Sequence, residues 1–174
     1  MKITYYCAMS LDGFIAREDG DVSWLDGMSI DESESSYDNF FASVDGLAMG
    51  RSTYDFVFNF GSWPYGDLLT WIFTSKSLKP LEGANLNLVR TMDEFIEETN
   101  KKRMEHIWLV GGGKLASSFL ESSILTHLSI TEVPIKLNAG IPLFSDHKLE
   151  DIESSKTKSI QKQGYKQIEV ILRE

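Results

Sequence analysis

The amino-acid sequence predicts an α/β fold: a single doubly wound, mostly parallel sheet with helices on both faces and a C-terminal antiparallel hairpin. Two observations carry this prediction. Short apolar runs alternate with segments whose apolar residues recur at helical spacing, which is typical of βαβ units. Near the C-terminus, two β-like stretches follow each other with no helix between them. The 174 residues fit one domain, 1–174, because domains commonly contain about 150 residues.

The first 50 residues predict a first core strand, a loop, a helix and a second strand. Residues 3–10 form a β-rich run that continues after a turn over 14–16. Residues 17–39 contain many turn formers and few periodic apolar positions, so we expect a long surface loop. A helix is expected from Tyr37, and the apolar run 46–50 that follows it predicts a short buried strand.

The middle of the chain repeats the alternation of helix and strand. Ser52 is a suitable N-cap for a helix that runs until Gly61. Buried strands are expected over 71–74 and, more weakly, over 87–89. A helix over 93–104 follows, with apolar residues on one face and charges on the other.

The last third contains the clearest unit. An apolar strand over 106–110, a glycine turn, a helix over 115–120 and an alternating strand over 128–133 predict a βαβ crossover. The β-like stretches 149–158 and 167–172 then predict the hairpin, with Gln163 and Gly164 near its tip.

Composition excludes several functions. Seventeen Lys and Arg against 26 Asp and Glu give a net charge of −9, which repels nucleic acids and anionic membranes. No apolar run approaches the ~18 residues of a membrane span, and Asp12 interrupts the N-terminal stretch, so we expect a cytoplasmic protein. The single Cys7 is expected in the core, and three scattered His provide no close-spaced metal ligands.

The glycine turn is the richest chemical feature, because Gly111, Gly112 and Gly113 let backbone amides approach a ligand at a helix N-terminus. Phosphate suits such a site, and Lys114 adds positive charge. A tight turn without a ligand is the alternative. A P-loop is disfavoured, because a non-glycine residue stands where the first glycine of that pattern is required.

The same turn matches the dinucleotide-binding pattern G-x-G-x-x-A through Gly111, Gly113 and Ala116. Glu132 lies about twenty residues further on, where a ribose-binding acid would stand. An NAD-linked Rossmann dehydrogenase therefore remains an alternative. Its weakness is position, since only a loop and a hairpin are expected after Glu132, whereas a Rossmann domain needs further crossovers.

Two further strand ends carry groups suited to anions. They are Gly50, Arg51, Ser52 and Thr53 after one strand, and Thr74, Ser75 and Lys76 after the next. An arginine with hydroxyls suits a phosphomonoester such as the 2′-phosphate of NADP. Alternatively, Arg51 is an ordinary surface residue and Ser52 only a helix cap. These two strand ends and the glycine turn should meet at the carboxyl edge of a parallel sheet, where ligands bind in α/β folds.

Six segments together resemble the dihydrofolate reductase-like fold, in particular the branch related to the reductase domain of the bifunctional riboflavin-biosynthesis deaminase-reductase. They are AMSLDGFIA (8–16), GDVSWL (20–25), MGRSTYD (49–55), FTSKSL (73–78), LVGGGKLASSFL (109–120) and GIPLF (140–144). Their order and spacing extend the resemblance over nearly the whole chain. It implies NADPH as the cofactor, a small-molecule substrate and a homodimer.

The resemblance also implies where the cofactor lies. Residues 50–53 and 74–76 would hold the adenosine 2′-phosphate end, and the turn from Gly111 to Leu115 the pyrophosphate. The residues expected beside the nicotinamide are Ala8, Met9 and Ile15.

Three departures concern the substrate. Gly111 stands where the riboflavin-pathway reductases carry a glutamate thought to face the substrate, which argues against the riboflavin precursor. The helix carboxylate that contacts the pterin in the folate enzymes would correspond to Glu34 or Asp38. Thr131 matches the threonine that accompanies this carboxylate; it either faces the substrate or is an ordinary strand threonine.

Two more residues complete the expected site. Asp12 follows the strand under the nicotinamide and is a candidate proton donor, although Asp-Gly is also a common turn pair and water can deliver a proton. Trp24 either forms a wall of the pocket or packs as core. We therefore expect an NADPH-dependent reductase that transfers hydride to a C=N or C=O bond of a small molecule. A non-catalytic NADP(H)-binding protein is the alternative.

Overall fold

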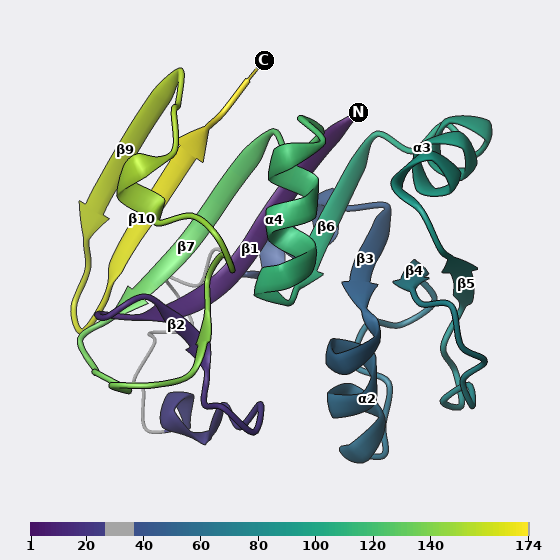
Figure 1. Ribbon diagram of the computed structural model, residues 1–174, viewed down its shortest axis with the longest axis horizontal. Coiled ribbons are helices and arrows are strands. Elements are labelled where there is room, and N and C mark those ends of the chain that lie inside the picture. Colours follow the sequence, from purple (N-terminus) through teal and green to yellow (C-terminus); the bar gives the residue numbers. More distant parts are fainter. Residues whose placement is uncertain (27–36, 174) are drawn as a thin grey trace.

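The computed structural model describes residues 1–26 and 37–173, and within these residues eight strands form one sheet in the order β5-β4-β3-β6-β1-β7-β10-β9 (Figure 1). The strands are β1 (Lys2–Ser10), β3 (Gly46–Gly50), β4 (Leu69–Phe73), β5 (Leu86–Val89), β6 (His106–Gly111), β7 (His127–Val133), β9 (Lys156–Gln161) and β10 (Lys166–Ile171). Neighbours from β5 to β7 are parallel, whereas β10 and β9 are antiparallel. The predicted mixed sheet with a C-terminal hairpin is confirmed.

Helices cover both faces of the sheet. They are α1 (Tyr37–Ser43), α2 (Arg51–Asn59), α3 (Met92–Lys101) and α4 (Gly113–Glu121). On one face, Phe95 of α3 and Phe119 of α4 pack against strand residues such as Trp71. On the other, Tyr54 of α2 packs with Trp108, and α1 lies against the same cluster. Each such large apolar side chain contributes about 1.5–3 kcal/mol when it is fully buried.

The predicted crossover from β6 through α4 to β7 is confirmed, and β1 lies between the two strands. Ile3 pairs with Ile107 on β6, while Ala8 pairs with Thr131 on β7, both in parallel. Figure 1 shows α4 in front of β1 and β6. The N-terminal strand is thus central, and its carboxyl end lies beside that of β7.

Some boundaries differ from those expected. Gly50, not Ser52, is the N-cap of α2, and no side chain caps this helix. The helix of the crossover begins at Gly113 instead of residue 115. Residues 149–151 form a 3-10 turn, so β9 begins only at Lys156.

A second, two-stranded sheet was not predicted. It pairs β2 (Phe14–Ala16) with β8 (Ile141–Pro142). β8 has only two residues, which is too few to give an alternating pattern. One of the two is a proline, which is typical of a loop or an edge strand. This pair brings the segment after β1 beside the segment after β7.

Candidate functional site

The three segments predicted to bind the cofactor, 50–53, 74–76 and 111–115, lie side by side at the carboxyl edge of the sheet. In the register of β3 with its neighbours, Gly50 pairs with Phe73 on β4, and Met49 pairs with Gly111 on β6. Residues 50–53, 74–76 and 111–115 therefore leave three adjacent parallel strands at the same level. Their convergence follows from the register.

Two helices begin at this edge with glycine as the N-cap. Gly50 precedes α2 and Gly112 precedes α4, and neither helix has a side-chain cap. A Cβ on Gly112 would lie 3.7 Å from Oγ1 of Thr53, and one on Gly50 would lie 3.8 Å from the carbonyl oxygen of Gly111. The two helix starts thus face each other closely. Their first N–H groups and dipoles favour an anion between them.

The structure gives a different account of each glycine in the turn over 111–113. Gly111 has φ +131°, which side chains rarely adopt. A Cβ on Gly113 would collide with the carbonyl oxygen of Pro142, so packing of α4 against β8 requires this glycine. At Gly112, only Thr53 lies within contact distance of a Cβ. Packing therefore does not by itself require a glycine at this position.

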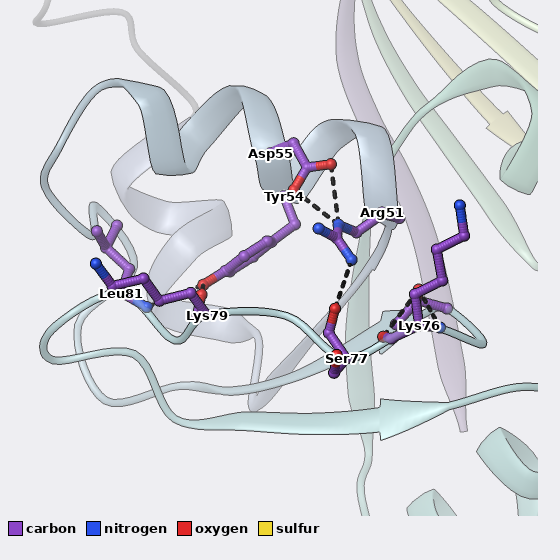
Figure 2. A network of polar contacts seen from close by, with 8 residues as sticks. Arg51, Tyr54, Asp55, Lys76, Ser77, Lys79 and Leu81 are labelled. Carbon is purple, nitrogen blue, oxygen red and sulfur yellow. Dashed lines mark hydrogen bonds and ion pairs between the residues drawn. The ribbon is translucent and has the colours of Figure 1, made fainter.

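Arg51 is held at the start of α2 (Figure 2). Its Nε donates to both carboxylate oxygens of Asp55, at 2.7 and 2.9 Å, and its Nη1 donates to the carbonyl of Ser77 at 3.0 Å. The side chain remains 35% exposed. Arg51 is thus oriented by its neighbours, yet its charge lies at the surface of the predicted phosphate-binding edge.

Tyr54 fixes the loop that follows β4. Its hydroxyl donates to the carbonyl of Lys79 at 2.7 Å and accepts from the backbone N–H of Leu81 at 2.9 Å (Figure 2). Together with the bond from Arg51 to Ser77, this contact ties the loop to α2. The loop is therefore ordered by the protein itself.

The other residues expected at the phosphate end are placed at the same edge. Oγ1 of Thr74 accepts from the backbone N–H of Lys76 at 3.1 Å, which forms a tight turn. Ser52, Ser75, Lys76 and Lys114 are exposed, while Thr53 and Leu115 are half-buried. Lysine side chains here supply positive charge in a protein of net charge −9.

The segment expected beside the nicotinamide faces both sides of β1. Ala8 is half-buried and packs against a cluster that contains Trp24 and Val133. Met9 is only 5% exposed and belongs to the core on the opposite face, against which half-buried Ile15 also packs. Ala8 is therefore the residue whose side chain points toward the Trp24 cluster.

Trp24 packs as part of the core, which is one of the two roles expected for it. It is 7% exposed and packs in the cluster with Val133 and Leu137. Its indole Nε1 is buried and has no hydrogen-bond partner among residues 1–26 and 37–173. A buried N–H without a partner is unfavourable unless a ligand or water accepts from it.

Asp12 binds the loop that follows β7. Its carboxylate accepts from the hydroxyl of Ser10 at 2.7 Å and from the backbone N–H groups of Leu137 at 3.1 Å and Asn138 at 2.8 Å. Desolvation opposes ionisation, but these hydrogen bonds outweigh it and lower the pKa of Asp12. An ionised carboxylate with occupied oxygens fits a structural acceptor better than a proton donor.

Thr131 has a partner that sequence reasoning missed. Its hydroxyl donates to Oε1 of Gln167 on β10 at 2.9 Å. The two residues are directly opposite in the antiparallel register. The hairpin was predicted, but its register, and hence this pair, depends on the structure.

The remaining acidic candidates are exposed, paired with a lysine, or outside the described residues. Asp38 is exposed in the first turn of α1, and Glu34 lies outside the described residues. Glu132 pairs with Lys166 at 3.6 Å. The Rossmann alternative is wrong on topology, because the first strand here leads into a turn and β2, not into a glycine turn and a crossover helix.

Other chemistries have no support in the described part of the chain. Burial raises the pKa of the Cys7 thiol to about 12, which keeps it protonated. No group of three or more His, Cys, Asp or Glu side chains in residues 1–26 and 37–173 is arranged to hold a metal ion. Within the same residues, every helix is too short or too polar to cross a membrane.

No family model matches the chain. A relative in Bacillus subtilis, the uncharacterized protein YwjB, is 33% identical over 147 residues, which cover 83% of this chain and 83% of the relative. The chain belongs to the family of YwjB. This relationship establishes the family but assigns no reaction to the chain.

Solved structures show the same fold. A putative riboflavin biosynthesis protein from Shewanella sp. PV-4 superposes with a TM-score of 0.79 at 26% identity and covers 98% of both chains. The Thermotoga maritima diaminohydroxyphosphoribosylaminopyrimidine deaminase/5-amino-6-(5-phosphoribosylamino)uracil reductase gives a TM-score of 0.73 at 16% identity; 98% of this chain matches 56% of that one. This chain thus has the dihydrofolate reductase-like fold that the sequence predicts, a fold it shares with these solved structures.

Proposed function

We propose that this protein is an NADPH-dependent reductase that transfers hydride to a C=N or C=O bond of a small molecule. The observation that carries the proposal is the pair of uncapped helix starts at Gly50 and Gly112, which face each other at the carboxyl edge of the sheet. This geometry suits the pyrophosphate of a dinucleotide. The fold shared with riboflavin-pathway reductase domains adds support.

The adjacent residues favour NADPH over NADH. Arg51 is oriented but still partly exposed, and the 74–76 turn brings hydroxyls and Lys76 to the next strand end. A 2′-phosphate carries nearly two negative charges, which such groups stabilise through charge-assisted hydrogen bonds. When bound, NADPH supplies the hydride, and the protein supplies position and exclusion of water.

The substrate would lie on the Ala8 side of β1, near Trp24 and Thr131. The indole N–H of Trp24 has no partner within residues 1–26 and 37–173 and would donate to a ligand, and Thr131 lies directly beside Ala8 in the register of β1 with β7. Asp12 would position the 137–138 backbone at this end, and a water molecule would deliver the proton. Gly111 in place of the glutamate argues for a substrate other than the riboflavin precursor.

A non-catalytic NADP(H)-binding protein is the second candidate, because the structure ties the carboxylate of Asp12 into the loop. Binding of NADPH and NADH, measured by calorimetry, tests the cofactor assignment. Equal affinity for the two would contradict it. Loss of NADPH absorbance with dihydrofolate, the riboflavin-pathway ribosylaminopyrimidine, and small imines and carbonyls tests catalysis, and tight binding without any turnover favours the non-catalytic candidate.

A homodimer is also proposed, on the resemblance to riboflavin-pathway reductases. The outer strand β9 is exposed along its whole length and presents an open edge, which supports an interface there. Light scattering coupled to size-exclusion chromatography measures the state directly. A monomer at all concentrations would contradict the dimer without affecting the cofactor assignment.

A further inference from the structure

Four polar side chains form a closed set of hydrogen bonds on β7 and β10. Thr131 is directly opposite Gln167, and Ser129 is directly opposite Glu169. All four lie on the same face of the sheet as Ala8, because Ala8 pairs with Thr131 on β7 and side chains alternate along a strand. Ser129 is buried, so part of this set is shielded from water.

The chemistry of the set fixes the direction of every bond. Oε1 of Glu169 accepts from the Ser129 hydroxyl at 2.7 Å and from Nε2 of Gln167 at 2.8 Å. The same Nε2 also donates to the Ser129 hydroxyl at 3.1 Å. An ionised carboxylate only accepts, so the Gln167 amide must turn its nitrogen toward Glu169.

The orientation of Gln167 then decides the state of Thr131. Turning the amide over would lose two hydrogen bonds and place its carbonyl against a carboxylate. Its Oε1 therefore faces Thr131 and, as a carbonyl oxygen, only accepts. The Thr131 hydroxyl must use its single proton on Gln167, at 2.9 Å, and keeps only lone pairs for any other partner.

We propose that Gln167 is a positioning residue that makes Thr131 a dedicated hydrogen-bond acceptor, so that the site selects substrates with an N–H or O–H donor at this point. The inference rests on the proposed function, because it takes Thr131 to face the substrate. A ring amide or an amino-substituted heterocycle fits this requirement. A carbonyl oxygen at the same point would meet only lone pairs, which is unfavourable.

Four small pyrimidines test the inference, because they combine amino and carbonyl groups at two ring positions. They are 2,4-diaminopyrimidine, isocytosine, cytosine and uracil. Their affinities for NADPH-loaded protein are measured by calorimetric competition, at a pH that keeps the diamino compound neutral. One of the two ring positions should contact Thr131. At that position, we expect a compound with an amino group to bind about tenfold more tightly than the matching compound with a carbonyl group.

Variants of Gln167 separate positioning from general structure. In Gln167→Met the Thr131 hydroxyl is free to donate or accept, so the preference should fall to within about twofold. In the double variant Gln167→Glu/Glu169→Gln a carboxylate still accepts from Thr131 and an amide donates to that carboxylate, so the preference should persist. Gln161→Met is the matched control, because the Gln161 amide donates to backbone carbonyls at the tip of the same hairpin. NADPH affinity should be the same in all four proteins.

The outcomes distinguish this inference from the proposed function. An unchanged preference in Gln167→Met, or no binding of any of the four pyrimidines, overturns the inference while NADPH binding still supports the reductase. Failure of the wild type to bind NADPH overturns the proposed function itself. If Gln167→Met does not fold, Glu169→Gln tests the same step, because an amide there lets Gln167 turn over and the preference should again fall.

Discussion

Within the described residues, three helices begin at the carboxyl edge of the sheet, and their starts differ. At α3 the protein closes its own helix end: the Thr91 hydroxyl accepts from the backbone N–H of Glu94, and the Glu94 carboxylate accepts in return from the backbone N–H of Thr91. At α2 and α4 the N-cap is glycine, and no side chain replaces the missing acceptor. The side-chain-capped helix α3 follows β5, one of the two edge strands, whereas α2 and α4 follow the central strands β3 and β6.

The difference supports the ligand site proposed above. Helix N-terminal N–H groups need acceptors, and a chain that supplies them at one helix has no general difficulty in doing so. Leaving two adjacent starts open, with glycine at each, keeps space and donors for an anion.

The largest effect is expected from the turn before α4. Gly113→Val should destabilise the protein by about 3 kcal/mol or more, because its Cβ would collide with the Pro142 carbonyl. Gly112→Ala should fold with a loss of about 1 kcal/mol or less, yet lose the stabilisation of roughly 2.7 kcal/mol that NADPH at 100 times its dissociation constant gives the wild type. Thermal unfolding with and without NADPH measures both. Full stabilisation of Gly112→Ala would show that the pyrophosphate binds elsewhere.

The next effect concerns Arg51. Arg51→Gln should weaken NADPH binding by about 1.5–3 kcal/mol and leave NADH binding nearly unchanged, because only NADPH presents a 2′-phosphate. Asp55→Asn is the matched control, since it removes the charge of the ion-pair partner but keeps Arg51. Calorimetric titration with both cofactors measures the difference. An equal loss for NADPH and NADH would assign Arg51 to loop order through Ser77 instead of phosphate binding.

A smaller effect is expected when the side-chain cap of α3 is removed or a capping side chain is added to α2. Thr91→Ala should reduce stability by about 1 kcal/mol without changing NADPH affinity. Gly50→Asp introduces a capping carboxylate at α2; the unliganded protein should change by only a few tenths of a kcal/mol, while NADPH affinity falls because the new charge repels phosphate. Chemical denaturation and calorimetry measure the two quantities. The comparison fails if Thr91→Ala weakens NADPH binding as much as Gly50→Asp does.

The sequence was sufficient for the sheet and for the three segments predicted to bind the cofactor, because both depend on local patterns. Apolar runs and glycine turns identify β3, β4 and β6, and parallel neighbours necessarily bring their carboxyl ends together. The structural roles of single residues could not be predicted in the same way, because they depend on contacts between segments that are distant in sequence. Gly113 is required by Pro142, which is distant in sequence. The partner of Thr131 depends on the register of β7 with β10, which no local pattern encodes.

The smallest effect is expected at the opposite end of β6, where the protein again satisfies its own polar groups. Nε2 of His106 lies 2.8 Å from Oγ1 of Thr4, and its Nδ1 lies 3.1 Å from the carbonyl of Ser43. Burial lowers the pKa of His106, Lys2 lowers it further, and the Ser43 carbonyl and Asp45 oppose this in part. Burial likewise lowers the pKa of His127.

Both shifts have the same sign for stability. The unfolded chain binds a proton at each histidine as the pH falls through about 6.5, whereas the folded chain binds it only at lower pH. The free energy of unfolding should therefore decrease below about pH 6.5 and level off once the folded protein is also protonated. His106→Gln should flatten this decrease, with His147→Gln as the control at an exposed position. Urea denaturation between pH 7.5 and about pH 5 measures the profile, and an equal slope in His106→Gln and wild type would rule out His106 as its source. Because His106 lies far along β6 from Gly112, NADPH affinity at neutral pH should not respond to His106→Gln, and this independence separates the closed end of the strand from the open one.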